Sequence, residues 1–143
     1  MSVYEATAEI NAPIERVWLI LSAVGSWPSW LPTISRVQPL DGSSIAIGAR
    51  FLLRQPKLRP TVWTVTDLEP PRRFAWRAAM PGMELLADHA LECIDASTTK
   101  ASLRFELSGW LGRLLSVAYG GITRAYLAQE AQALKRVAEA MPR

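Results

Sequence analysis

Hydrophobic and polar residues alternate along much of the chain up to residue 107, which is the spacing expected of β-strands with one buried face. Turn signals such as Asp41-Gly42, Pro70-Pro71 and Pro81-Gly82 divide this alternation into short segments. We therefore predict seven strands, over residues 3–10, 34–40, 49–54, 61–68, 73–78, 84–94 and 99–107. Strands so near each other in sequence pair antiparallel, because parallel neighbours need a long crossover.

Two segments after the first strand have a helical pattern instead. Four apolar residues fall on one helical face: Ile14, Val17, Trp18 and Leu21. Gly25 ends this helix, and residues 26–32 form a short helical turn bounded by prolines. After Ser108-Gly109 the pattern predicts one long helix over residues 111–141. This order of elements indicates an α+β architecture, in which helices cover one face of a sheet.

The long helix has two apolar stripes on different faces. One stripe contains Leu127, Ala131, Leu134, Ala138 and Met141, and the other contains Leu115, Ile122 and Tyr126. The stripes change over near Gly120-Gly121, and glycine inside a helix costs about 1 kcal/mol relative to alanine. We predict a kink, a break or a close backbone approach at this pair, and expect room for a ligand there.

Composition supports a single domain spanning residues 1–143. Half of the residues are hydrophobic and 20% are charged, which argues against disorder. Cys93 is the only cysteine, so no internal disulfide can form. The first residues lack a signal-peptide pattern, and no apolar run approaches the ~20 residues of a membrane helix. We expect a cytoplasmic protein without membrane insertion.

The chain is mildly basic, with a formal net charge of +3 and a cluster of arginines between Arg50 and Arg77. Such a cluster can mark a nucleic-acid or membrane surface. Alternation, however, places these arginines on the outer sheet face, beside carboxylates such as Glu84 and Asp88 on a neighbouring strand. We favour cross-strand ion pairs and, because no nucleic-acid-binding motif is present, expect no nucleic-acid partner.

The inner face of the sheet is almost uniformly apolar. His89, the only histidine, stands on this face together with Leu91 and Cys93. A buried imidazole needs hydrogen-bond partners, so His89 is either a satisfied core residue or a polar group in a cavity. Asp88 points to the opposite face and does not orient it. One histidine and one cysteine cannot form a zinc site, and we expect neither a metal nor a cofactor.

Several motifs occur along the chain in a characteristic order. They are the opening Glu9-Ile10-Asn11-Ala12-Pro13-Ile14-Glu15-Arg16-Val17-Trp18, the segment Trp27-Pro28-Ser29-Trp30-Leu31-Pro32, the stretches Gly48-Ala49-Arg50-Phe51 and Pro70-Pro71-Arg72-Arg73-Phe74-Ala75-Trp76-Arg77, and the final long helix. Together they resemble the START-like (SRPBCC) superfamily, and within it the polyketide cyclase/dehydrase and lipid transport branch. It implies a helix-grip fold, in which a seven-stranded antiparallel sheet wraps around a long C-terminal helix, with two short helices between strands 1 and 2. It also implies a deep cavity for apolar molecules.

We expect a domain that binds a small hydrophobic ligand, lipid-like or polyketide-like, between the sheet and the long helix. The alternative is a polyketide cyclase or dehydratase with His89 as acid/base and a hydroxyl from Tyr119 or Tyr126. A third hypothesis is an interaction domain whose interior is filled. The residues expected at a ligand, each of which could instead be core, are Trp27, Trp30, Phe51, Trp76, His89, Leu91, Phe105, Tyr119, Ile122 and Tyr126. The orientation of Trp63 depends on whether a bulge follows it.

Overall fold

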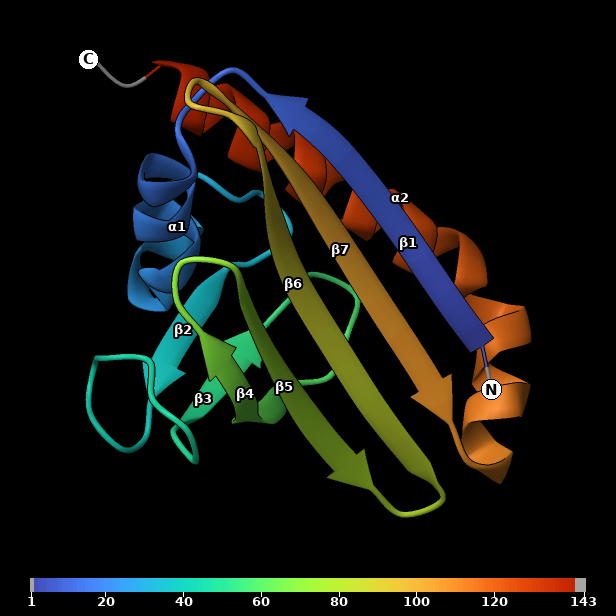
Figure 1. The fold of residues 1–143 in the computed structure, drawn as a ribbon. Coiled ribbons are helices and arrows are strands. Elements are labelled where there is room, and N and C mark those ends of the chain that lie inside the picture. The colour runs from blue at the N-terminus through green and yellow to red at the C-terminus, as the bar shows by residue number, and fades with distance from the viewer. Residues whose placement is uncertain (1, 141–143) are drawn as a thin grey trace.

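A computed structural model describes residues 2–140 and confirms the helix-grip architecture (Figure 1). Its elements are β1 (Ser2–Ile10), α1 (Ile14–Ser22), the 3-10 helix η1 (Val24–Ser29), β2 (Arg36–Pro39), β3 (Arg50–Arg54), β4 (Thr61–Glu69), β5 (Arg73–Met80), β6 (Met83–Asp95), β7 (Thr98–Ser108) and α2 (Trp110–Ala140). The strands form one antiparallel sheet in the order β1-β7-β6-β5-β4-β3-β2. Short connections between consecutive strands explain this order, because each of β2 to β7 pairs with its neighbour in sequence.

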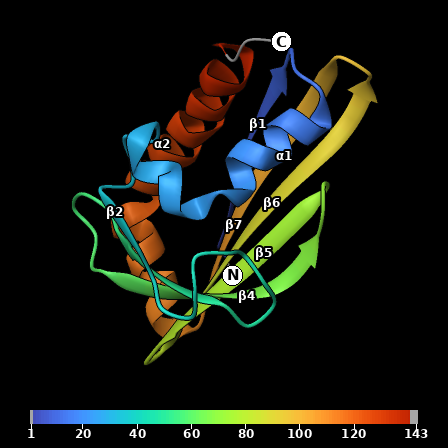
Figure 2. The same cartoon turned by 90° about the vertical axis from the view of Figure 1, so that its left-hand side faces the viewer.

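The helices lie on the concave side of the sheet. Figure 2 shows α1 and η1 on the same side of the sheet as α2, near the C-terminal end of the long helix. Val17 and Leu21 of α1 are buried, as are Val24 and Trp27 of η1, and all four belong to the main hydrophobic core. The short helices therefore close one end of the space between the sheet and α2.

The long helix runs without a break from Trp110 to Ala140. Of the three alternatives predicted for Gly120-Gly121, the break does not occur, and the close approach is present at the first glycine. Neither glycine lines the cavity between the sheet and α2, so the room for a ligand that we expected at this pair is not found there. Gly120 is buried, and a Cβ atom there would lie 3.2 Å from the hydroxyl oxygen of Tyr4 on β1. Gly121 has open space around it, since a Cβ atom at this position would have no neighbouring atom within 4 Å. Met141, the last member of the predicted stripe, lies outside the described residues.

Most strand side chains lie on the face of the sheet that alternation predicted. Leu85, His89 and Leu91 of β6 are buried on the inner face. Cys93 keeps the predicted parity, since it pairs in regular register with buried Thr99, but it is exposed because it lies near the end of the strand. On the outer face, the cross-strand pairs form as expected, with Nε of Arg73 2.9 Å from Oδ1 of Asp88.

Candidate functional site

A cavity of about 520 Å3 lies between the inner face of the sheet and α2. Strands β4 to β7 supply most of one wall, residues of α2 between Leu111 and Glu130 supply the other, and the segment between β3 and β4 borders it. Its size and mainly hydrophobic lining are typical of sites for small molecules. The filled interior that would have favoured an interaction domain without a ligand is not observed.

Six of the ten residues expected at a ligand line this cavity. They are Trp27, Trp76, His89, Phe105, Tyr119 and Tyr126. The other four lie outside the lining. Phe51 and Leu91 are buried in the core, with the Phe51 ring packed against Trp76 at a centroid distance of 5.9 Å. Trp30 and Ile122 are partly buried, and neither lines the cavity.

Four aromatic rings form a continuous part of the wall. The ring centroids of Trp27 and Trp76 are 5.3 Å apart, those of Trp63 and Trp76 are 5.8 Å apart, and those of Trp63 and Phe105 are 6.3 Å apart. Tilted and edge-on pairs of this kind contribute about 0.5–1.5 kcal/mol each beyond the area they bury. Trp63 faces inward, and the register of β4 against β5 shifts just after it, which is the bulge its orientation depended on.

His89 is held in a fixed orientation by the sheet. Its Nδ1 lies 3.2 Å from the carbonyl oxygen of Phe74, its partner across the β5–β6 ladder. The imidazole also stacks on the Phe74 ring, with centroids 4.1 Å apart and planes 13° apart. Burial among apolar groups lowers the pKa of His89 to about 4, since the charged form loses its hydration. The ring is therefore neutral at pH 7.

Glu130 is a polar group of the cavity that the sequence pattern did not predict. It lies on α2 in the lining, and its Oε1 accepts a hydrogen bond of 3.1 Å from the hydroxyl of buried Thr33. Burial raises the pKa of Glu130 from 4.5 to about 7, although the bond from Thr33 opposes this shift. A signal was available, because Glu130 continues by one helical turn the face that already carries Tyr119 and Tyr126.

The segment between β3 and β4 adds three polar side chains to the cavity lining. Gln55, Lys57 and Arg59 of this segment line the cavity. The hydroxyl of Tyr126 donates a hydrogen bond to the carbonyl oxygen of Pro56, which ties the segment to α2. This bond occupies the Tyr126 proton, so of the two tyrosines only Tyr119, which is 46% exposed, keeps its hydroxyl proton without a partner among the described residues.

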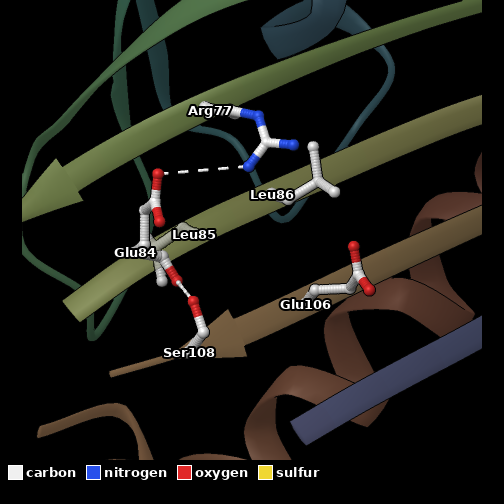
Figure 3. Close-up of a pocket in the computed structure, with 6 residues that line it drawn as sticks. All are labelled: Arg77, Glu84, Leu85, Leu86, Glu106 and Ser108. Atoms are coloured by element: carbon white, nitrogen blue, oxygen red, sulfur yellow. Dashed lines mark hydrogen bonds and ion pairs between the residues drawn. The ribbon is translucent and has the colours of Figure 1, made fainter. Parts of the chain in front are cut away.

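A second depression, of about 200 Å3, lies on the outer face of the sheet. Figure 3 shows Arg77 directed toward Glu84, with Glu106 on the neighbouring strand. The Arg77 and Glu84 charges are 4.0 Å apart, and Glu106 lies 3.2 Å from Arg104. These ion pairs agree with the interpretation of Arg73 and Arg77 as part of a solvated sheet face, whereas Arg59 of the same arginine cluster lines the cavity.

Residues 2–140 contain neither a metal-binding cluster nor a membrane-spanning helix. No three His, Cys, Asp or Glu side chains in this range are grouped so that they could hold a metal ion. None of the helices in this range is both long and apolar enough to cross a bilayer. Among the polar side chains of the cavity lining, His89 and Glu130 are the two whose pKa values burial displaces.

The sheet, the long helix and the cavity between them are those of a helix-grip fold. Comparison with known proteins leads to the same class. The model of the family described as polyketide cyclase / dehydrase and lipid transport matches residues 1–139, so the chain belongs to this family. No curated protein matches the sequence.

Solved structures share the fold at low sequence identity. The Zhui aromatase/cyclase from Streptomyces sp. R1128 is 19% identical, with a TM-score of 0.77 over 96% of this chain and 93% of that one. A hypothetical protein from Helicobacter pylori is 13% identical, with a TM-score of 0.80 over 96% and 88%. The di-domain ARO/CYC BexL from the BE-7585A biosynthetic pathway is 21% identical, with a TM-score of 0.68 over 95% and 46%.

Proposed function

We propose that this protein binds one small hydrophobic molecule, lipid-like or polyketide-like, in the cavity between the sheet and α2. The observation that carries the proposal is a cavity of about 520 Å3 whose lining is mainly aliphatic and aromatic. A ligand that buries about 200 Å2 of apolar surface there gains roughly 5 kcal/mol from the hydrophobic effect, before the cost of association. The family, whose description includes lipid transport, supports the same function.

Filling the cavity from one position tests this proposal. Ala87 lines the cavity on β6, and its ladder partners are Trp76 and Phe105. Ala87→Phe should therefore abolish binding of the neutral dye N-phenyl-1-naphthylamine, measured by its gain in fluorescence in an apolar site. Ala79→Phe is the matched control, because Ala79 is exposed on neighbouring β5 and the same bulk is added outside the cavity. Equal dye binding by both variants would argue against a site in this cavity.

A second candidate function is that of a cyclase or dehydratase. Two titratable groups in the cavity have pKa values displaced in opposite directions, with His89 at about 4 and Glu130 at about 7. Such a pair can divide the roles of base and acid near neutral pH. Neutral His89 would take a proton from the carbon beside a ketone, and protonated Glu130 would give its proton to a departing β-hydroxyl, which leaves as water.

The two candidate functions differ in what happens to the ligand. Incubation with cell extract followed by mass spectrometry identifies the molecule that co-purifies and shows whether it has been altered. Recovery of one unmodified lipid, with no turnover of β-hydroxy ketones, would favour the binding protein. If the protein is an enzyme, His89→Ala and Glu130→Gln should each abolish turnover, and Tyr119→Phe should reduce it. Unchanged turnover in His89→Ala would remove His89 from the catalytic role.

A further inference from the structure

The hydrogen bond at His89 determines which ring nitrogen carries the proton. The carbonyl oxygen of Phe74 can only accept a hydrogen bond, and it lies 3.2 Å from Nδ1. The imidazole is neutral because it is buried. The single ring proton must therefore be on Nδ1, which leaves Nε2 as an unprotonated nitrogen with a free lone pair.

The lone pair of Nε2 has no hydrogen-bond partner among residues 2–140. No described residue donates a hydrogen bond to it, and the indole N–H of Trp27, whose ring is 5.7 Å away, donates to the carbonyl oxygen of Leu21 instead. Among the described residues, the only unpartnered side-chain nitrogen or oxygen that is also sealed from solvent is Nε1 of Trp63. The Nε2 atom of His89 therefore retains open surface, and His89, which is buried with 6% of its surface exposed, lines the cavity.

We propose that His89 selects ligands that bring a hydroxyl group to its Nε2 atom, such as phenols, enols or alcohols, over matched ligands whose oxygens only accept hydrogen bonds. This inference rests on the proposed binding function and adds the polar part of the ligand to it. A hydroxyl proton satisfies the lone pair, whereas a ketone or ether oxygen would place a second lone pair against it. Two indole rings lie beside His89, but the N–H of Trp27 donates to Leu21, and no hydrogen bond joins Trp76 to Nε2 among the described residues.

The stacking of His89 on Phe74 also restricts the direction from which a ligand hydroxyl can reach Nε2. The imidazole plane is fixed by the Nδ1 bond on one side and by the parallel Phe74 ring on its face. A ligand hydroxyl must therefore approach in the plane of the imidazole, from the cavity. Preorganisation of this kind lowers the entropic cost of forming the bond.

Competition between three matched probes tests the inference. Fluorene, 2-methoxyfluorene and 2-hydroxyfluorene share one ring system and differ in having no oxygen, an acceptor oxygen or a hydroxyl. In displacing N-phenyl-1-naphthylamine, 2-hydroxyfluorene should bind about threefold to tenfold more tightly than 2-methoxyfluorene, which is the ratio expected of one neutral hydrogen bond. His89→Phe, which keeps an aromatic ring over Phe74, should reduce the ratio to within about twofold.

The outcomes separate this inference from the proposed function. Failure of fluorene to displace the dye, or of the dye to bind, would overturn the proposed function and with it the inference. Binding of all three probes with equal affinity would overturn only the inference. Loss of the hydroxyl preference in Glu130→Gln, but not in His89→Phe, would assign the hydroxyl to Glu130 and also overturn it.

A measurement on the unmodified protein gives a second test. Because His89 is the only histidine, its two ring nitrogens give the only imidazole signals in a 15N NMR spectrum of labelled protein. At pH 7 the signals should show a protonated Nδ1 and an unprotonated Nε2, and 2-hydroxyfluorene should shift the Nε2 signal while 2-methoxyfluorene does not. A proton on Nε2 in the free protein would overturn the inference without any ligand.

Discussion

Replacing Glu130 with glutamine should change how the stability of the protein depends on pH. Glu130 titrates in the cavity wall with a pKa of about 7, against an ordinary value of 4.5. Between these values the folded protein keeps the proton that the unfolded chain has released. Stability conferred by the protonated group is therefore present at low pH and is lost as pH rises through 7.

The size of this loss follows from the displacement of the pKa. At 1.36 kcal/mol for each pH unit, the interval from 4.5 to about 7 corresponds to about 3 kcal/mol at alkaline pH. Glutamine has nearly the same shape as the protonated carboxyl, can still accept the bond from Thr33 and has no proton to release. The free energy of unfolding of Glu130→Gln should thus exceed that of the wild type by a margin that grows by about 2–3 kcal/mol between pH 5 and pH 8.

His89 contributes with the opposite sign. Its pKa is about 4 in the folded protein, against an ordinary 6.5, so the unfolded chain binds a proton first as pH falls. Its contribution to stability is present above 6.5 and is lost as pH falls toward 4. Between pH 5 and 6.5 the two groups therefore oppose one another in the wild type. In His89→Phe, which lacks the opposing contribution, the free energy of unfolding should fall with rising pH because of Glu130.

Guanidinium unfolding followed by tryptophan fluorescence at pH 5, 6, 7 and 8 measures these differences. The comparison of variant with wild type at each pH cancels the contributions of the other carboxylates, provided that the slope with denaturant is unchanged. A stability difference between Glu130→Gln and wild type that stays constant over this range would show that Glu130 does not titrate with a raised pKa. It would also remove the acid from the proposed dehydration.

Three glycine substitutions give further predictions, each measured as a change in the free energy of unfolding. Gly121→Ala should stabilise the protein by up to about 1 kcal/mol, because the site is helical and open. Gly120→Ala should gain less or lose stability, since its Cβ would press on the Tyr4 hydroxyl, and an equal gain at both positions would contradict the close approach. Gly109→Ala should cost about 2 kcal/mol or more, because φ is +93° and its Cβ would lie 2.4 Å from the carbonyl oxygen of Gly82.

The sheet could be predicted from sequence because each strand shows its own alternation of apolar and polar residues and is bounded by turn residues. Period-two alternation assigned most residues of β6 to the correct face, and it placed His89 on the inner side, where it lies. Turn residues then set the strand boundaries to within a few positions. Alternation assigned Cys93 to the inner face but could not show that it is exposed, because a period-two pattern gives the face of a side chain and not how far the core extends along the strand.

The site was less predictable than the fold, because a cavity and a core have the same composition. Phe51 and Phe105 both face inward, yet the first is buried in the core and the second lines the cavity. Whether an inward side chain is core or cavity lining depends on the distance between α2 and the sheet, and local sequence patterns do not predict this distance. Glu130 was missed for a related reason: a carboxylate on a helix of mixed polarity indicates a solvated face until the partner surface is known.

The place of β1 beside β7 bears on the order in which the protein folds. Strands β2 to β7 pair with sequence neighbours, whereas β1 pairs with β7, with Ser2 opposite Leu107. Contacts between segments so far apart in sequence form slowly, because the intervening chain must be closed into a loop first. Since α2 follows β7 in the sequence and packs on β1, this helix can cover the aromatic inner face only after β7 has been made. During synthesis, the chain therefore acquires its cavity only after all seven strands have been made.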